Sequence, residues 1–543
     1  MPIINQFGRL IMDPFSKLNL HFTVTITTRL IACIVLLLSF STTYGTSNET
    51  IDDYVQQVMA TFHVPGVSVG VVKDGSIVHM QGYGIADIET GQKVDEFTIF
   101  KIASNTKAFT ATALATLVEQ GKMEWTDKVN QHLPDFKMYD QYASQEFNII
   151  DLLTHRSGLG LGSGDLMLWP EPTKFTREQL VKNLRYLKPA YGFREKYAYD
   201  NTLYIVAGEV AASIAGTSWE EYIEQSIFKP LGMENCYAGG IDTKKIKNVV
   251  APHLYMNGQS IVDQPNRIRK NSTLMAAAGG IKCSLHDLMT WVDLQLRHGV
   301  TKDGTRLVSE EQARKMWYPV TPLRVSKSAR ELDNTNFRGY ALGWRVNDYR
   351  GQWMVSHTGT LSGAMSQIVL LPDSNLAIVV MINQSSGYAR NALSRGITNY
   401  FLGEDPQQSL LRNVERQKER QAWLQTEEAK EQGMVLPPET QITKKMARGR
   451  LGNYVDPWFG KISMTREGDD VVFQADNVPR MVGKVYAYDK DTWWVKWDNR
   501  SFEADSWIRF EKNARKLNMT MERIAEDSDW SMSVQDLFFT KKR

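Results

Sequence analysis

Residues 97–121 constrain the fold of this chain most, because they specify a helix that is stable only inside the protein. An apolar approach leads into an alanine- and threonine-rich run at residues 108–120, and Gly121 ends the helix. Ser104 and Lys107 stand at its start, three residues apart and therefore on one side of the helix. The pattern predicts a buried helix that begins with a serine–lysine pair.

This pair has a specific chemical use. A serine hydroxyl is a weak nucleophile until a neighbouring group takes its proton, and a lysine held in a dry pocket can do so. The free backbone N–H groups at a helix N-terminus also favour a developing negative charge. The position of Ser104 and Lys107 therefore indicates nucleophilic catalysis.

Two further motifs complete a set: Tyr199-Asp200-Asn201 and His357-Thr358-Gly359. Serine–lysine, Tyr-x-Asn and a basic residue-x-Gly, in this order, resemble the motifs of the penicillin-recognising serine hydrolases. The tyrosine is similar to that of the class C branch, which includes class C β-lactamases, D-aminopeptidases and penicillin-binding-protein-like enzymes. The segment Asp-Leu-Leu-Thr-His-Arg-Ser-Gly-Leu at residues 151–159 also resembles this family, and the resemblance runs over about residues 51–400.

The resemblance implies an acyl-enzyme on Ser104 and no cofactor. Lys107 and Tyr199 would share the proton transfers, and the sequence does not decide which of the two holds the proton at rest, since coupled groups titrate as a pair. A nearby ammonium would favour the tyrosine phenolate and make it a plausible general base.

The same resemblance implies the substrate-binding residues. Asn201 would bind Lys107 and the substrate amide, the N–H groups of Ser104 and Thr360 would form the oxyanion hole, and Gly359 would let substrate approach the strand closely. His357 departs from the family, whose antibiotic-hydrolysing members carry lysine there. Histidine is mostly neutral at pH 7, which argues against an efficient β-lactamase and favours a peptidase, amidase or esterase.

Other polar residues are assigned structural roles. His155 and Arg156 belong to the family-like segment, but nothing marks them as catalytic. The formal net charge of +2 gives no electrostatic case for nucleic-acid binding. Nine scattered histidines and three cysteines show no metal-ligand spacing.

The predicted fold class is α+β. Residues 67–72 and 77–83 flank Asp74-Gly75, a strong hairpin signal. Helical segments follow, and strand-like runs return between residues 343 and 382. Strands at both ends with helices between them favour an antiparallel sheet covered by helices, as in β-lactamases and DD-peptidases.

The N-terminal residues 1–45 read as a targeting segment, with an apolar run after Arg29. A cleaved signal peptide and secretion into an extracytoplasmic compartment is the preferred interpretation, with a signal anchor in the membrane or a mitochondrial transit peptide as alternatives. In an oxidising compartment Cys236 and Cys283 could pair, although two cysteines alone do not establish a disulfide.

The remaining chain is predicted to divide into residues 46–403, the catalytic domain; 404–446, a charged helical linker; and 447–543, a small all-β, lipocalin-like domain. The aromatic residues of the β-domain, including Trp493, Trp494 and Trp497, are expected to fill a barrel core, with a ligand cup as the alternative. The domain could also cover the active site.

These observations predict a serine hydrolase that acts on small peptides, D-amino-acid amides or esters. The alternative is a non-catalytic protein, a sensor or filament-forming scaffold that has kept the penicillin-binding fold. Neither the substrate nor the oligomeric state follows from the sequence.

Overall fold

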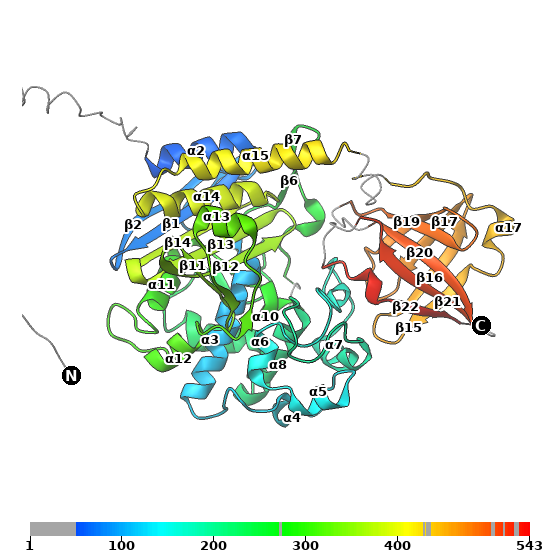
Figure 1. Ribbon diagram of the computed structural model, residues 1–543, viewed down its shortest axis with the longest axis horizontal. Helices are drawn as coiled ribbons and strands as arrows, with labels where there is room; N and C mark the ends of the chain where they lie inside the picture. The colour runs from blue at the N-terminus through cyan, green and yellow to red at the C-terminus, as the bar shows by residue number, and fades with distance from the viewer. Residues whose placement is uncertain are drawn as a thin grey trace, which may run out of the picture. The chain divides into compact units, whose positions relative to one another are not determined.

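The computed structural model describes residues 50–270, 274–426, 429, 436–500, 505–513, 516–525 and 531–542. The predicted targeting segment, residues 1–45, lies outside these ranges. Within them, no helix combines the length and the apolar character that a membrane span requires. The catalytic fold and the C-terminal β-domain both belong to one compact unit, Asp53–Arg543 (Figure 1).

A nine-stranded antiparallel sheet forms the centre of the larger domain, in the order β3-β2-β1-β14-β13-β12-β11-β10-β9. Its strands are β1 (Gly66–Lys73), β2 (Ser76–Asp87), β3 (Gln92–Lys93), β9 (Thr321–Pro322), β10 (Arg338–Tyr340), β11 (Arg345–Tyr349), β12 (Gln352–Leu361), β13 (Ala364–Leu371) and β14 (Leu376–Ile382). Strand β1 pairs with β14 along its length, so the two ends of the domain meet in the sheet as predicted. The hairpin between β1 and β2 is also confirmed, with Asp74 and Gly75 both at positive φ in its turn.

Helices cover both faces of the sheet (Figure 1). The described helices are α2 (Ile51–Phe62), α3 (Thr106–Glu119), α4 (Val129–His132), α5 (Gln141–Glu146), α6 (Ile149–Leu153), α7 (Arg177–Asn183), α8 (Thr202–Ala215), α9 (Trp219–Ile223), α10 (Ala276–Gly279), α11 (Leu285–Leu296), α12 (Glu310–Lys315), α13 (Lys327–Asp333), α14 (Gly387–Phe401) and α15 (Gln407–Trp423), followed by α17 (Lys444–Ala447), which lies beside the barrel. Helices α14 and α11 contact the central strand β14. This arrangement confirms the predicted α+β class.

Helix α3 is buried almost along its whole length, as its alanine- and threonine-rich sequence predicts. Small side chains let α8 and α10 pack closely against it, while Phe109 stacks on Trp291 of α11 with ring centroids 3.8 Å apart. Gly121 takes φ +65° and ends the helix. The core therefore holds the first turn of α3 in a fixed position.

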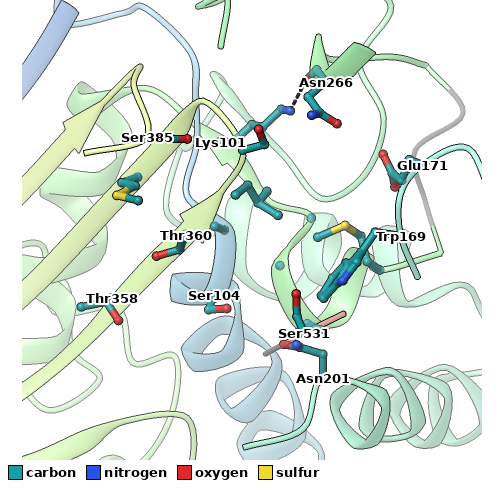
Figure 2. Close-up of a pocket in the computed structure, with 18 of the residues that line it drawn as sticks. Lys101, Ser104, Trp169, Glu171, Asn201, Asn266, Thr358, Thr360, Ser385 and Ser531 are labelled. Carbon is teal, nitrogen blue, oxygen red and sulfur yellow. Dashed lines mark hydrogen bonds between the residues drawn. The ribbon is translucent and has the colours of Figure 1, made fainter. Parts of the chain in front are cut away.

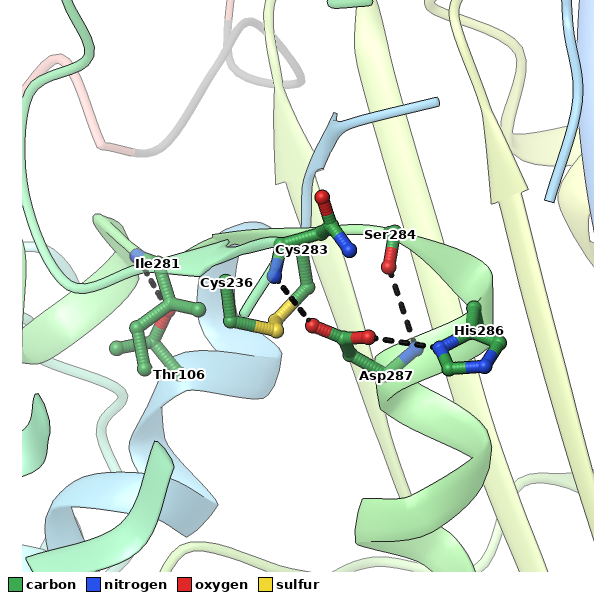
Figure 3. The surroundings of a disulfide bond; sticks show 8 residues. Thr106, Cys236, Ile281, Cys283, Ser284, His286 and Asp287 are labelled. Atoms are coloured by element: carbon green, nitrogen blue, oxygen red, sulfur yellow. Dashed lines mark hydrogen bonds and ion pairs between the residues drawn. A yellow bond between two sulfur atoms is a disulfide. The ribbon is translucent and has the colours of Figure 1, made fainter. Parts of the chain in front are cut away.

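A small three-stranded sheet borders this first turn. It consists of β4 (Phe100–Lys101), β8 (Lys282–Cys283) and β5 (Cys236–Tyr237), and a disulfide joins Cys236 to Cys283 across two directly paired positions. Figure 3 shows the backbone N–H of Ile281 donating to the Thr106 hydroxyl at 3.1 Å. The disulfide sheet is thereby attached to the start of α3. The remaining short strands, β6 (His253–Met256) and β7 (Gln259–Val262), form a separate hairpin.

The C-terminal domain is a closed antiparallel barrel of eight strands. The strands are β15 (Gly452–Asp456), β16 (Gly460–Glu467), β17 (Asp470–Ala475), β18 (Val482–Ala487), β19 (Thr492–Trp497), β20 (Ser506–Asn513), β21 (Lys516–Arg523) and β22 (Phe538–Lys541). Trp493 and Trp497 belong to the main core, whereas Trp494 packs against Tyr486 on the other face of β19. All three indoles are buried, so they fill packed cores, as the preferred interpretation expected.

The chain between the two domains contains α15 and α17. Helix α15 lies against α14, where Leu410 is buried and the Asn399 side-chain amide donates to the Ser409 hydroxyl at 3.2 Å. The predicted linker helix is thus packed onto the larger domain. The domain boundaries at residues 403 and 446 remain predictions.

We expect replacement of Cys236 and Cys283 by alanine to lower the free energy of unfolding by about 2–4 kcal/mol, because the disulfide restricts a long loop in the unfolded chain. Urea unfolding of the oxidised full chain and of the double variant, followed by circular dichroism, measures the difference. A reductant should shift the midpoint of the native protein and leave that of the variant unchanged. Equal midpoints for the two oxidised proteins would contradict the prediction.

Candidate active site

Ser104 lies on a tight turn between β4 and α3. The 3₁₀ turn η1 (Ala103–Asn105) runs directly into the helix, and Ala103 adopts φ +49°, a left-handed conformation that costs a non-glycine residue of order 1 kcal/mol. Ser366 of β13 accepts a hydrogen bond from the Asn105 amide and donates to the carbonyl of Ile102, at 2.7 Å each. The turn is therefore held from the sheet side, with Ser104 partly exposed at its tip.

The Lys107 ammonium connects three elements at the base of the site. Its Nζ lies 3.2 Å from the Ser104 hydroxyl, 2.7 Å from Oδ1 of Asn201 and 2.8 Å from the carbonyl of Ala278. Burial lowers the pKa of Lys107 to about 7, against the opposing effect of the Asp165 and Asp200 carboxylates. Near neutral pH, a large fraction of this side chain is therefore the free amine, which can accept a proton.

Tyr199 faces the same serine. Its phenol hydrogen-bonds to Ser104, and the Lys107 Nζ lies 4.8 Å from its ring centroid. Burial raises the pKa of Tyr199 well above that of free tyrosine, although the Arg345 charge and the Ser104 hydrogen bond act in the opposite direction. Tyr199 is therefore a neutral phenol that can donate a proton, and Lys107 is the better base of the two groups.

Asn201 follows Tyr199 just before α8. Its Oδ1 accepts from Lys107, and its Nδ2 donates to Oδ2 of Asp165 at 2.7 Å. Asp165 is completely buried and was not anticipated from the sequence, where it resembles an ordinary loop acid in a glycine-rich segment. Its carboxylate orients the Asn201 amide and adds negative charge near Lys107.

Strand β12 forms the opposite wall. A Cβ atom at Gly359 would lie 2.2 Å from the carbonyl oxygen of Ile102 and 3.0 Å from the Cβ of Ala103, so only glycine fits. Glycine is thus required at position 359 because β12 packs directly against the turn that carries Ser104. This contact brings Thr360 beside Ser104 on the cavity wall, where the two predicted oxyanion-hole residues meet.

His357 lies in β12 but does not line the cavity described below. Its Nδ1 donates to the carbonyl of Thr358 at 2.8 Å, which leaves Nε2 to accept from the Tyr340 hydroxyl at 2.9 Å. Burial holds the pKa of His357 well below its usual range, so the ring is neutral. The His357 ring therefore packs among aromatic side chains, with its centroid 6.4 Å from that of Tyr199, and it does not line the cavity, where the sequence predicted a substrate contact.

Two arginines supply positive charge on the same wall. Arg345 of β11 donates from Nη1 to the Thr358 hydroxyl at 3.2 Å and from Nη2 to the Tyr197 hydroxyl at 3.3 Å. Arg390 of α14 donates to the Thr360 hydroxyl at 3.0 Å. The sequence did not point to either arginine, because only the pairing of β11 with β12 brings Arg345 to the site.

The residues assigned structural roles lie beneath the site. The backbone N–H of Asp200 donates to Nδ1 of His155 at 3.2 Å, and burial holds the pKa of this ring well below its usual range. Arg156 donates to the Asp151 carboxylate at 2.8 Å. His155 thereby anchors the segment that carries Tyr199 and Asn201, while Arg156 is held by α6, which contains Asp151.

Among the residues described above, those that line a cavity of about 580 Å³ are Ser104, Tyr199, Asn201, Arg345, Thr358, Thr360 and Arg390. In Figure 2, Ser104 lies at its floor, with Thr358 and Thr360 on one side and Trp169 and Glu171 on the other. Within the described residues, no group of three or more histidine, cysteine, aspartate or glutamate side chains could hold a metal ion. The side chains gathered around Ser104, namely Lys107, Tyr199 and Asn201, are of the types that covalent serine catalysis uses.

The barrel contributes to this cavity. Ser531 and Met532, which precede the turn η7 (Val534–Asp536), are among its lining residues. Arg480, between β17 and β18, donates from Nη1 to the carbonyl of Glu171 at 2.7 Å and to Oδ1 of Asn266 at 3.3 Å. The barrel thus supplies one wall and fixes two segments that form another.

Comparison with known proteins supports this description. The sequence is 29% identical over 357 residues to an unguisins hydrolase of Aspergillus campestris and 27% identical over 361 residues to the protein flp of Staphylococcus aureus N315. Each alignment covers 63% of this chain, and the chain spans 63% and 64% of the length of these curated relatives.

Solved structures share the fold. An octameric penicillin-binding protein homologue from Pyrococcus abyssi superposes with a TM-score of 0.55 at 21% identity, covering 90% of this chain and 99% of that one. A class C beta lactamase from Rhodobacter sphaeroides gives a TM-score of 0.51 at 20% identity, covering 64% of this chain and 97% of that one.

Two family models match the chain. Residues 436–541, which include the barrel strands, match a domain of unknown function, DUF3471. Residues 51–397, well over half of the chain, match the beta-lactamase family. The chain therefore belongs to the beta-lactamase family.

Proposed function

We propose that this protein is a serine hydrolase that forms an acyl-enzyme on Ser104. One observation carries the proposal: a buried lysine amine, with its pKa lowered to about 7, lies 3.2 Å from the serine hydroxyl in a cavity that admits a small substrate. A packing role for Lys107 would require neither the serine nor the cavity.

The reaction follows from the geometry. Ser104 Oγ forms a bond to the substrate carbonyl carbon while its proton passes to Lys107. The carbonyl oxygen becomes an oxyanion, for which we propose the N–H groups of Ser104 and Thr360 as the stabilising donors. The carbonyl then re-forms, the bond to the leaving group breaks, and the leaving group takes a proton from Tyr199, which Lys107 replenishes. Water releases the acyl group by the same steps.

For substrates we propose small peptides, D-amino-acid amides or esters that carry a carboxylate on the leaving group. The half-buried Arg345 guanidinium beside the Thr358 hydroxyl supports this class, because arginine binds carboxylates through two parallel hydrogen bonds. Carboxylate binding, which the sequence placed in doubt at His357, is thus assigned to a different residue. Efficient β-lactam hydrolysis is not part of the proposal.

We also propose an extracytoplasmic location, reached through the N-terminal targeting segment. The disulfide between Cys236 and Cys283 supports an oxidising compartment. A membrane anchor and a mitochondrial location are the alternatives.

The nucleophile is tested by labelling the full chain with a fluorophosphonate and measuring its intact mass. We expect one adduct on the native protein and none on Ser104→Ala. Ser362→Ala removes another serine that lines the cavity and should keep the adduct. Absence of an adduct in folded native protein would overturn the hydrolase proposal and favour the scaffold or sensor alternative.

The base is tested by the pH dependence of kcat/KM on an uncharged ester. The protonated Lys107 is inactive, so the rate should rise with pH through an apparent pKa of about 7. Burial also raises the pKa of Asp200 to about 7, and its carboxylate raises that of Lys107. If Lys107 is the base, Asp200→Asn should therefore shift the rise in kcat/KM to lower pH. If the rise disappears in this variant, it reports the titration of Asp200 instead.

Carboxylate recognition is tested with two thioesters, hippuryl thioglycolate and its methyl ester. We expect Arg345→Gln to lower kcat/KM about 10- to 100-fold on the acid, since a charge-assisted hydrogen bond contributes about 1.5–3 kcal/mol. The methyl ester should change less than about 3-fold. Arg338→Gln removes an arginine of the neighbouring strand that does not line the cavity, and should affect neither substrate. Equal losses on both substrates would refute the assignment.

A further inference from the structure

Two lysines that the proposed reaction does not use also line the cavity. Lys101 of β4 and Lys282 of β8 are directly paired across the disulfide sheet, so their side chains lie on the same face. Figure 2 shows Lys101 beside Asn266 at one end of the cavity, away from Thr358 on the β12 wall. The cavity therefore holds cationic groups in two separate places, at Arg345 beside Thr358 and at this pair of lysines.

Lys282 is buried and Lys101 is half-buried, and neither ammonium is paired with a carboxylate among the described residues. Lys101 donates to the carbonyl of Asn266, and Lys282 donates to the carbonyls of Gly239 at 2.7 Å and Gly280 at 2.8 Å. In the part of the chain that the structure describes, these neutral carbonyls are their only hydrogen-bond acceptors, and neither lysine forms an ion pair. An ammonium has three N–H donors. Two donors of Lys101 and one of Lys282 thus remain for a ligand.

Charged groups of both signs surround the two lysines. The Glu171 carboxylate acts on both of them, Asp263 acts on Lys101, and Glu220 acts on Lys282. Arg269 adds positive charge beside Lys101, and Arg480 fixes the Glu171 backbone. The Asp263 carboxylate already accepts from the Ser362 hydroxyl and the Asn266 amide. Burial lowers the pKa of both lysines to about 8, so they remain mostly charged at neutral pH.

We propose that Lys101 and Lys282 form an anion subsite that binds a carboxylate on the acyl part of the substrate. This inference rests on the proposed function, in which Arg345 holds the leaving-group side of the scissile bond. With the leaving group held at Arg345, the acyl group on Ser104 has the rest of the cavity to occupy, and the two lysines line that part. A bound carboxylate would accept the remaining N–H donors and offset the repulsion between two like charges.

The test compares two esters that differ only in the end of the acyl chain: 4-nitrophenyl hydrogen glutarate, which ends in a carboxylate, and 4-nitrophenyl pentanoate, which ends in a methyl group. We expect the native full chain to favour the anionic ester by at least about 10-fold in kcat/KM, the factor that about 1.4 kcal/mol supplies. Lys101→Gln keeps a donor for the Asn266 carbonyl and should abolish this preference. The rate on the neutral ester should stay within about 2-fold, which also shows that the variant is folded.

Matched variants separate the alternatives. Lys302→Gln removes an exposed lysine far from the cavity lining and should keep the preference. Lys282→Gln should lose it, as Lys101→Gln does. Equal rates of the native protein on both esters would overturn the subsite. So would a preference lost in Arg345→Gln but kept in the lysine variants, or parallel losses on both esters, which would indicate a structural role.

Binding to the inactive protein distinguishes failure of this inference from failure of the proposed function. Calorimetric titration of the full-length Ser104→Ala variant with glutarate should show binding that is weakened about 10-fold or more by adding Lys101→Gln. If neither ester is hydrolysed but glutarate binding depends on Lys101, the subsite stands and the hydrolase proposal falls. If the esters are hydrolysed without a preference and glutarate does not bind, the subsite falls alone.

Discussion

The structure of this site depends on burying the Lys107 ammonium. Transferring a charged amine from water into a protein interior is costly unless hydrogen bonds and opposite charges compensate it. Here Lys107 donates hydrogen bonds to Asn201, just before α8, and to the carbonyl of Ala278 in α10. The carboxylates of Asp165 and Asp200 lie near enough to favour its charged form. The compensation is partial, because the pKa remains lowered to about 7. The same contacts that fix the helices around α3 thus leave the lysine ready to exchange a proton.

Much of this arrangement could be predicted from local sequence. The buried helix with Ser104 and Lys107 at its start, the Asp74-Gly75 hairpin and the pairing of the first and last strands all follow from hydrophobic periodicity and turn chemistry. Tyr199 and Asn201 were found through the order of motifs, and the structure brings both to Lys107. These features are local, or repeat a pattern that the chain shares with its family.

What could not be predicted depends on pairing between distant segments. A histidine in the same motif as Gly359 suggests a substrate contact, yet the His357 ring hydrogen-bonds to the Tyr340 hydroxyl of β10, two strands away in the sheet. Arg345 lies in an ordinary strand sequence, and its register opposite Ser356 alone brings it to the site. Likewise, no composition signal links Ser531 or Arg480 to a cavity that begins at Ser104.

The close contact at Gly359 has a consequence for how this architecture can change. Because Gly359 lies against the nucleophile turn with no room for a Cβ atom, mutation has almost no freedom there, and the reacting centre is fixed in shape. The outer walls come instead from the loop around Glu171, the disulfide sheet and the barrel. The barrel holds the Glu171 loop through Arg480, so these two walls change together, and they can do so without moving the turn at Ser104. Specificity is therefore the evolvable part of this enzyme fold, and its chemistry is the inherited part.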